Sequence, residues 1–173
     1  GMSEKETEKK LKEGFEANLS GGQISGVANI VLNSVFGFQI SGGVNVAKGA
    51  LQGFQLSGIS NTVLKYSFGL QLAGLYNISD GSMDGAQVAI LFNGTSGELN
   101  GVQCAIFNRA GLIDGINSFQ YTGRTGFQIG LINRSGTMNG FQIGLVNIAG
   151  RMQGTQIGLI NIYRDGKTPE TRD

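Results

Sequence analysis

A short phrase recurs through most of this 173-residue chain. It reads Gly-x-Gln, then an apolar residue, then Ser, Ala or Gly, and an Asn follows a few residues later. Successive glutamines are 16 residues apart up to Gln103 and 14 apart from Gln128 onward. A short period with identical polar residues at fixed offsets requires a structure that stacks like on like. The sequence therefore predicts an all-β fold, a single-stranded parallel β-solenoid (β-helix or β-roll) of about ten 14- to 16-residue coils.

Two columns of side-chain amides define the predicted stack. Gln and Asn side chains that lie in register on successive coils can form hydrogen-bonded ladders along the axis. The predicted structural ladder consists of Gln39, Gln55, Gln71, Gln87, Gln103, Gln128, Gln142, Gln156, Asn45, Asn61, Asn77, Asn93, Asn108, Asn133, Asn147 and Asn161.

Other positions of the repeat predict the core and the corners. The apolar residue after each Gln is expected in the core: Ile24, Ile40, Leu56, Leu72, Val88, Cys104, Ile129, Ile143 and Ile157. The small residue that follows predicts a tight corner, and a Gly two residues before the Gln predicts the other turn. Four residues before the Gln, an apolar residue is expected to point inward from the opposite wall: Leu51, Met83, Leu99, Ile113, Met138 and Met152.

The chain divides into three parts by composition. Residues 1–19 predict a charged amphipathic helix, with a capping box at residues 3–6 and with Leu11, Phe15 and Leu19 on one face. This helix is expected to cap the first coil, or else to act as a spacer. Residues 20–163 form the repeat domain, and residues 164–173 form a polar tail that contains Pro169 and is expected to be disordered.

One stretch, residues 119–125, fits no column, and a bulge or shortened coil is expected there. The alternative is a functional notch formed by Tyr121 and Arg124.

Charge and composition restrict the function. The net charge is +1, and the 147 residues between positions 16 and 164 hold only ten charged side chains. This argues against nucleic-acid binding, which requires a basic stripe. With no His and one Cys in the chain, we expect no catalytic, cofactor-binding or metal-binding residues. Cys104 is expected to be a small buried apolar residue rather than a reactive thiol. No apolar run is long enough for a transmembrane helix.

Two sets of charged residues suggest alternatives. Asp80, Asp84, Glu98 and Asp114 could serve a carbohydrate-active β-helix enzyme if two of them met within about 5–10 Å. Turn chemistry explains Asp84 and Asp114 equally well. Arg109 and Arg134 each follow an Asn of the repeat, with Arg124 and Arg151 nearby, so these side chains could form an anion-binding edge or simply be solvated loop charges.

A membrane β-barrel is the main rival architecture, because segments such as residues 141–145 alternate in polarity. In an up-and-down meander, however, adjacent strands run in opposite directions, and one Gln column would not align.

The units at residues 126–133, 140–147 and 154–161 resemble the G-x-Q-I-G-L-x-N repeats of a largely uncharacterised family of bacterial surface-repeat proteins. The wider units, such as residues 37–45, resemble its G-x-Q-[IL]-S-G-x-x-N variant. The resemblance implies a bacterial protein of the cell envelope or a secreted one, whereas a native start at Met2 would indicate a cytoplasmic protein.

The expected function is therefore that of a non-catalytic structural or adhesin-like protein that presents a regular face to a glycan or protein surface. A carbohydrate-active enzyme or glycan-binding module is the alternative. Self-association is expected through the N-terminal helix or the solenoid ends. No membrane span and no nucleic-acid partner are expected.

Overall fold

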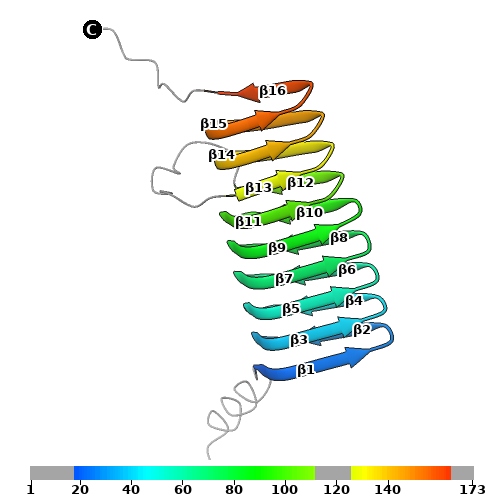
Figure 1. Cartoon of the computed structure of the whole chain (residues 1–173). Helices are drawn as coiled ribbons and strands as arrows, with labels where there is room; N and C mark the ends of the chain where they lie inside the picture. The colour runs from blue at the N-terminus through cyan, green and yellow to red at the C-terminus, as the bar shows by residue number, and fades with distance from the viewer. Residues whose placement is uncertain (1–17, 112–125, 165–173) are drawn as a thin grey trace, which may run out of the picture.

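The computed structural model describes residues 18–111 and 126–164, and these residues form a parallel β-solenoid (Figure 1). Each coil contributes one strand to each of two walls. The first wall contains β1 (Leu19–Ser25), β3 (Val35–Ser41), β5 (Leu51–Ser57), β7 (Ser67–Ala73), β9 (Met83–Ala89), β11 (Leu99–Cys104) and β13 (Gly126–Ile129). The second wall contains β2 (Ala28–Val31), β4 (Val44–Ala47), β6 (Ser60–Val63), β8 (Tyr76–Ser79), β10 (Phe92–Thr95) and β12 (Phe107–Ala110).

The last coils are narrower, and their strands run on from one wall to the other. Strands β14 (Ile132–Ile143) and β15 (Val146–Ile157) each begin in the second wall and end in the first, and β16 (Ile160–Tyr163) closes the second wall. We call the turn from the first wall to the second the first corner, as at residues 42–43. The turn back, as at residues 48–50, is the second corner. The predicted corner after the small residue is confirmed, since Ser41 ends β3.

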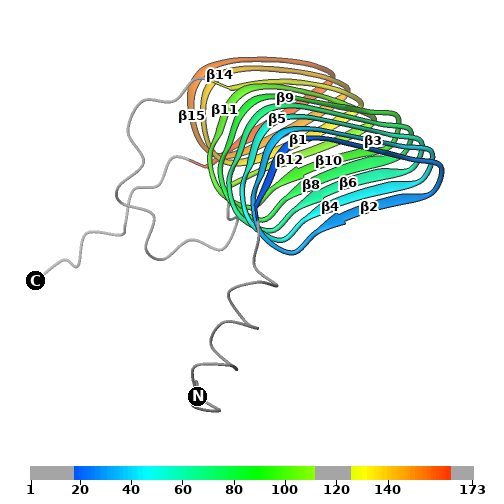
Figure 2. The ribbon, with the colours of Figure 1, turned by 90° about the horizontal axis from the view of Figure 1, so that it is seen from below.

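Every strand pair is parallel and every amide column is in register. Gln39 pairs with Gln55, and Asn45 pairs with Asn61, on adjacent coils. Figure 2, which looks along the stack, shows the coils lying over one another. The parallel direction is the one that a solenoid requires and an up-and-down meander does not allow.

The described residues contain nine Gln rungs, from Gln23 to Gln156, and therefore about eight full turns. The register passes directly from Gln103 to Gln128, so no further rung lies between them. The expectation of ten coils is thus not confirmed. The predicted irregular stretch, including Tyr121 and Arg124, falls in residues 112–125, outside the described part.

The glycine two residues before each Gln lies within a strand, not in a turn as the sequence suggested. Gly53, inside β5, has φ of +137°, and a Cβ built there would lie 1.8 Å from the carbonyl oxygen of Gly37 on the coil beneath. Side chains rarely adopt this backbone conformation, and here one would also strike the neighbouring backbone. Glycine therefore lets the first wall bend while adjacent coils keep their hydrogen-bonding distance.

The core prediction was wrong for the column that follows the glutamines. Leu56 is 41% exposed, whereas the neighbouring Gln55 is fully buried. Successive residues of a strand point to opposite faces, so only one of the two columns can face inward. The structure places the amide inside and the larger apolar side chain outside. Cys104 belongs to the same outer column and is partly exposed, not buried as predicted.

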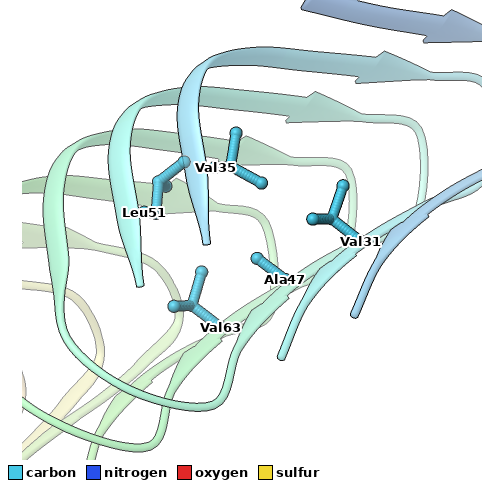
Figure 3. Close-up of a cluster of buried hydrophobic side chains, with 5 residues drawn as sticks. All are labelled: Val31, Val35, Ala47, Leu51 and Val63. Carbon is cyan, nitrogen blue, oxygen red and sulfur yellow. The ribbon is translucent and has the colours of Figure 1, made fainter. Parts of the chain in front are cut away.

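The interior also holds two apolar clusters. One comprises Val31, Val35, Ala47, Leu51 and Val63, whose side chains point toward one another from the two walls (Figure 3). The other comprises Met83, Leu99 and Ala110. The predicted inward column four residues before the Gln is therefore confirmed for Leu51, Met83, Leu99 and Met138. These residues share a strand with their Gln, not the opposite wall, and Ile113 lies outside the described residues.

A polar layer separates the two apolar clusters. The hydroxyls of Ser67 and Ser79 lie 2.8 Å apart, and Ser79 donates to Oε1 of Gln71 at 3.0 Å. Thr95 donates to Oε1 of Gln87 at 3.1 Å in the next coil. Ser67 and Ser79 thus place a hydrogen-bonded layer between the two apolar clusters, and Thr95 lies in the same coil as Met83 of the second cluster.

The ends of the chain differ in part from prediction. Leu19, expected to be the last residue of the capping helix, is instead the first residue of β1. The rest of that helix falls in residues 1–17, outside the described part. Arg164 still belongs to the stack, because its N–H donates to the carbonyl of Ala149 at 3.2 Å.

Candidate functional site

The glutamine column forms an unbroken ladder through the interior. In each step, Nε2 of one Gln donates to Oε1 of the Gln on the preceding rung. The eight donor–acceptor distances lie between 2.7 and 3.1 Å. From Gln39 to Gln142 every Gln of the column is 0% exposed. Burying an amide is costly unless it is hydrogen-bonded, and the ladder supplies those bonds at every rung.

The asparagine column forms a second ladder that runs in the opposite direction. Here Nδ2 donates to Oδ1 of the following rung, as from Asn45 to Asn61 at 2.9 Å. The same Nδ2 group lies 2.8 Å from the carbonyl oxygen of Leu56 and 3.2 Å from that of Gln39. Each Asn therefore joins the two walls across the first corner as well as joining successive coils.

The amide columns are structural and offer no chemistry to a ligand. A neutral amide is neither an acid, a base nor a nucleophile at ordinary pH, and these amides are closed off from solvent along the rod. The predicted ladder residues are thus brought together as expected, but as the interior of the protein. They become accessible only at the two ends.

The described carboxylates named as candidates, Asp80, Asp84 and Glu98, lie at three different positions of the repeat. Asp84 accepts a hydrogen bond from Nδ2 of Asn100 at 2.7 Å, on the adjacent coil. Asp80 is exposed and Glu98 half-buried at the second corner, and Asp114 lies outside the described residues. Residues 18–111 and 126–164 contain no group of three or more His, Cys, Asp and Glu side chains that could hold a metal ion.

Two of the four arginines named as a possible edge are neighbours. Arg109 and Arg134 are register partners in β12 and β14, and both are exposed on the outer face of the second wall. Arg151 pairs with Thr137 of β14, on the other side of the second corner, so it does not extend this pair. Arg124 lies outside the described residues.

The outer surface carries a feature that the sequence analysis missed, which we call the apolar band. It consists of four outward columns that run the length of the rod: the residues just before and just after each Gln, and the residues one and two positions before each Asn. Its exposed large side chains are Phe54, Leu70, Phe127, Phe141, Ile24, Leu56, Val88, Ile129, Ile143, Ile157, Val27, Ile59, Leu75, Leu91, Leu131, Leu145, Leu159, Tyr76, Phe107, Ile132 and Ile160.

No charged side chain lies in the apolar band. The charged residues of the described chain are Lys48, Lys65, Asp80, Asp84, Glu98, Arg109, Arg134, Arg151 and Arg164, all at other positions of the repeat. The columns of the band lie on part of the outer face of the first wall, at the first corner and on the second wall. Within it, Phe38 stacks on Phe54 and Phe127 on Phe141, each pair with ring centroids 5.3 Å apart.

One signal in the sequence could have indicated which column faces inward. The Gln column never varies from rung to rung, whereas the next column changes among Ile, Leu, Val and Cys. A close-packed interior restricts size and chemistry more tightly than an outer face does. The invariant column is therefore the better candidate for the interior, even though it is polar.

Comparison of the chain with protein-family models, with curated proteins and with solved structures found no match. No helix that is long and apolar enough to cross a membrane occurs in the described part of the chain. A functional assignment therefore depends on the surface of the solenoid itself.

Proposed function

We propose that this protein is a non-catalytic, adhesin-like structural module of a bacterial envelope, and that it attaches by laying its apolar band on a lipid surface. The observation that carries this proposal is the apolar band, which is continuous and uncharged. Monomeric soluble proteins rarely expose contiguous apolar patches above a few hundred Å², and larger patches mark interaction sites. The bacterial and envelope part of the proposal is supported by the resemblance of the repeat units to surface-repeat proteins.

A hydrocarbon partner fits the chemistry of the band better than a protein or glycan partner. Protein interfaces contain about ten direct hydrogen bonds and are enriched in Arg, and glycans likewise need directed polar contacts. Among the exposed side chains of the band, Tyr76 and Thr155 are almost the only ones that could donate one. A lipid surface requires no such donors.

The shape of the band also favours lipid. It turns through the first corner, where Leu75 and Leu145 are 40% and 48% exposed, so one flat partner surface cannot cover it. Acyl chains can surround a convex edge. The parallel ladders satisfy the backbone within the stack, as an apolar surrounding requires. The second corner, which carries Lys48 and Lys65, would remain in water.

Flotation with phosphatidylcholine vesicles tests this function. We expect the full chain to float with the vesicles and to remain bound in 1 M salt. The Debye length is then about 3 Å, so the salt screens attraction between charges but leaves apolar contact intact. The double variant Leu75→Glu/Leu145→Glu should remain in the soluble fraction, because it places two charges in the band at the first corner, where acyl chains would surround it.

The second corner provides a matched control. Leu32 and Leu64 are 47% and 44% exposed there, outside the band, so Leu32→Glu/Leu64→Glu makes the same chemical change on the opposite side. This control should float like the unaltered protein. The proposal fails if the unaltered chain does not float, if both double variants float equally, or if binding requires anionic lipid at low salt. A soluble dimer that only the band variant dissociates would assign the band to a protein partner instead.

A further inference from the structure

The two amide ladders leave unmatched groups at the two ends of the solenoid. At the N-terminal end, Gln23 accepts from Gln39 through Oε1, and its Nε2 has no partner among the described residues. Asn29 donates to Asn45, and no described group donates to its Oδ1. The N-terminal end therefore offers one amide donor and one amide acceptor.

The C-terminal end offers the opposite set. Gln156 donates to Gln142 through Nε2, and no described group donates to its Oε1. Asn161 accepts from Asn147, and its Nδ2 retains only a 3.3 Å contact with the carbonyl of Gly158. In an interior rung such as that of Asn147, Nδ2 donates at 2.8 and 2.9 Å to the following coil.

We infer that the solenoid associates head to tail, with the C-terminal coil of one copy placed beneath β1 and β2 of a second copy. In this arrangement Nε2 of Gln23 donates to Oε1 of Gln156, and Nδ2 of Asn161 donates to Oδ1 of Asn29. Both ladders then continue through the junction with unchanged direction. Two ends of the same kind that set Gln against Gln would oppose donor to donor, and they would also reverse the direction of the strands across the junction. Only the other end of a second copy continues the parallel stack.

The side chains of the end rungs are exposed as expected for rungs that lack a neighbour. Ile24 is 74% exposed, whereas Ile143 in the same column is 41% exposed. Leu159 is 83% exposed, whereas Leu145 in the same column is 48% exposed. The free edges of β1 and β16 also carry backbone groups that can pair with a further strand.

The two ends differ in coil width, yet the molecule already contains a junction of this kind. The wide coil of Gln103 lies directly against the narrow coil of Gln128, and Nε2 of Gln128 donates to Oε1 of Gln103 at 2.8 Å. The Asn ladder crosses the same step, from Asn108 to Asn133, at 2.9 Å. A narrow coil can therefore stack on a wide one without interrupting either ladder.

Two isosteric variants test the junction by blocking one end each. Gln23→Glu and Asn161→Asp each replace the free donor with a carboxylate oxygen, so an acceptor faces an acceptor and a charge is buried. By light scattering after size exclusion, the full chain should reach multiples of 18.2 kDa that increase with concentration. Each variant alone should remain at 18.2 kDa, and an equimolar mixture of the two should give a single species of twice that mass.

Two controls separate this inference from lipid attachment and from general effects of charge. Gln153→Glu adds the same charge at an exposed outward position of the last coil, and it should assemble like the unaltered chain. The band variant Leu75→Glu/Leu145→Glu should also assemble, whatever its behaviour with vesicles.

Several results would overturn the inference. The inference fails if the full chain stays monomeric at high concentration. It fails equally if the reason is that residues 1–17 or 165–173 cover an end. A closed dimer that does not grow, or a mixture of the two blocked variants that stays monomeric, would overturn it as well. The mixture forms a dimer only if the unblocked end of each variant is correctly folded. The mixing measurement therefore also detects a substitution that merely damages the fold.

Discussion

In the first wall, the glutamine column is buried and the apolar column that follows it faces outward. This is the reverse of the usual arrangement of polar and apolar residues. Gln55 is 0% exposed and donates and accepts along the ladder, whereas Leu56 beside it is 41% exposed on the outer surface. Both columns repeat with the same period on the same strands. The comparison shows that repetition along an axis can satisfy amides so fully that they occupy the interior.

A second difference distinguishes the two columns. The amide column depends on its neighbours above and below, because each Gln is both donor and acceptor for adjacent rungs. The outer column depends on them much less, since its side chains retain substantial contact with solvent. Substitutions in the interior should therefore affect several coils, whereas those outside should affect recognition by a partner more than stability.

The largest effect is expected from the backbone that lets the inner column stack. Gly53→Ala should lower the free energy of unfolding by more than about 4 kcal/mol, because the new Cβ meets the Gly37 carbonyl in a backbone conformation that itself disfavours alanine. Urea unfolding followed by far-UV circular dichroism would measure it. Gly26→Ala is the control, since a Cβ there meets nothing within 4 Å in the isolated chain. Equal losses in the two variants would show that steric contact between coils is not the reason.

A buried charge in the second amide column should have the next largest effect. Asn61→Asp removes a group that donates to the Leu72 carbonyl at 2.7 Å and to Asn77 at 2.9 Å, and it places a carboxylate where exposure is 0%. We expect a loss of about 3–5 kcal/mol. The same change at the exposed Asn161 should lower the free energy of unfolding of the monomer only slightly. Hydrogen exchange at the flanking coils would report whether the damage spreads along the ladder.

Exchanging the two columns at one rung tests the comparison directly. The double variant Gln55→Leu/Leu56→Gln has the same composition and a conventional polarity, with the apolar residue inside. It should nevertheless be less stable by about 3 kcal/mol, because it leaves Oε1 of Gln39 and Nε2 of Gln71 buried without partners. Leu56→Gln alone should change stability by less than about 0.5 kcal/mol. A double variant as stable as the parent would mean that the ladder contributes little.

The sequence predicted the parts of the structure that depend on register. The constant offsets of Gln and Asn determine that coils stack in parallel, and the structure confirms this at every described pair. The change of period after Gln103 correctly indicates the narrower coils. The register of each residue within its coil could therefore be predicted from the sequence alone.

The direction in which each column faces could not be predicted in the same way. Alternation along a strand separates two faces but does not state which one is buried, and polarity normally decides. Here Gln71 and Leu72 reverse that rule, because a hydrogen bond to the same residue on the next coil offsets the desolvation of the amide. The apolar band escaped prediction partly for the same reason, since one of its four columns, the residue after each Gln, was assigned to the core.

The smallest effect is expected at buried serine hydroxyls that make no hydrogen bond. The buried hydroxyls of Ser25, Ser41 and Ser57 have no hydrogen-bond partner among the described residues, and the following coils carry Ala73, Ala89 and Ala105 at this position. An unpaired buried hydroxyl is unfavourable, so Ser41→Ala should raise the free energy of unfolding by up to about 1 kcal/mol.

The matched variant is Ser67→Ala, which removes a hydroxyl that lies 2.8 Å from that of Ser79 and should lower stability by about 1 kcal/mol. Opposite signs for the two serines in the same urea titration would confirm that a polar group is tolerated inside this solenoid only where the stack pairs it. A loss of stability in Ser41→Ala would show instead that its hydroxyl has a partner in solution, and the contrast between paired and unpaired interior groups would then disappear.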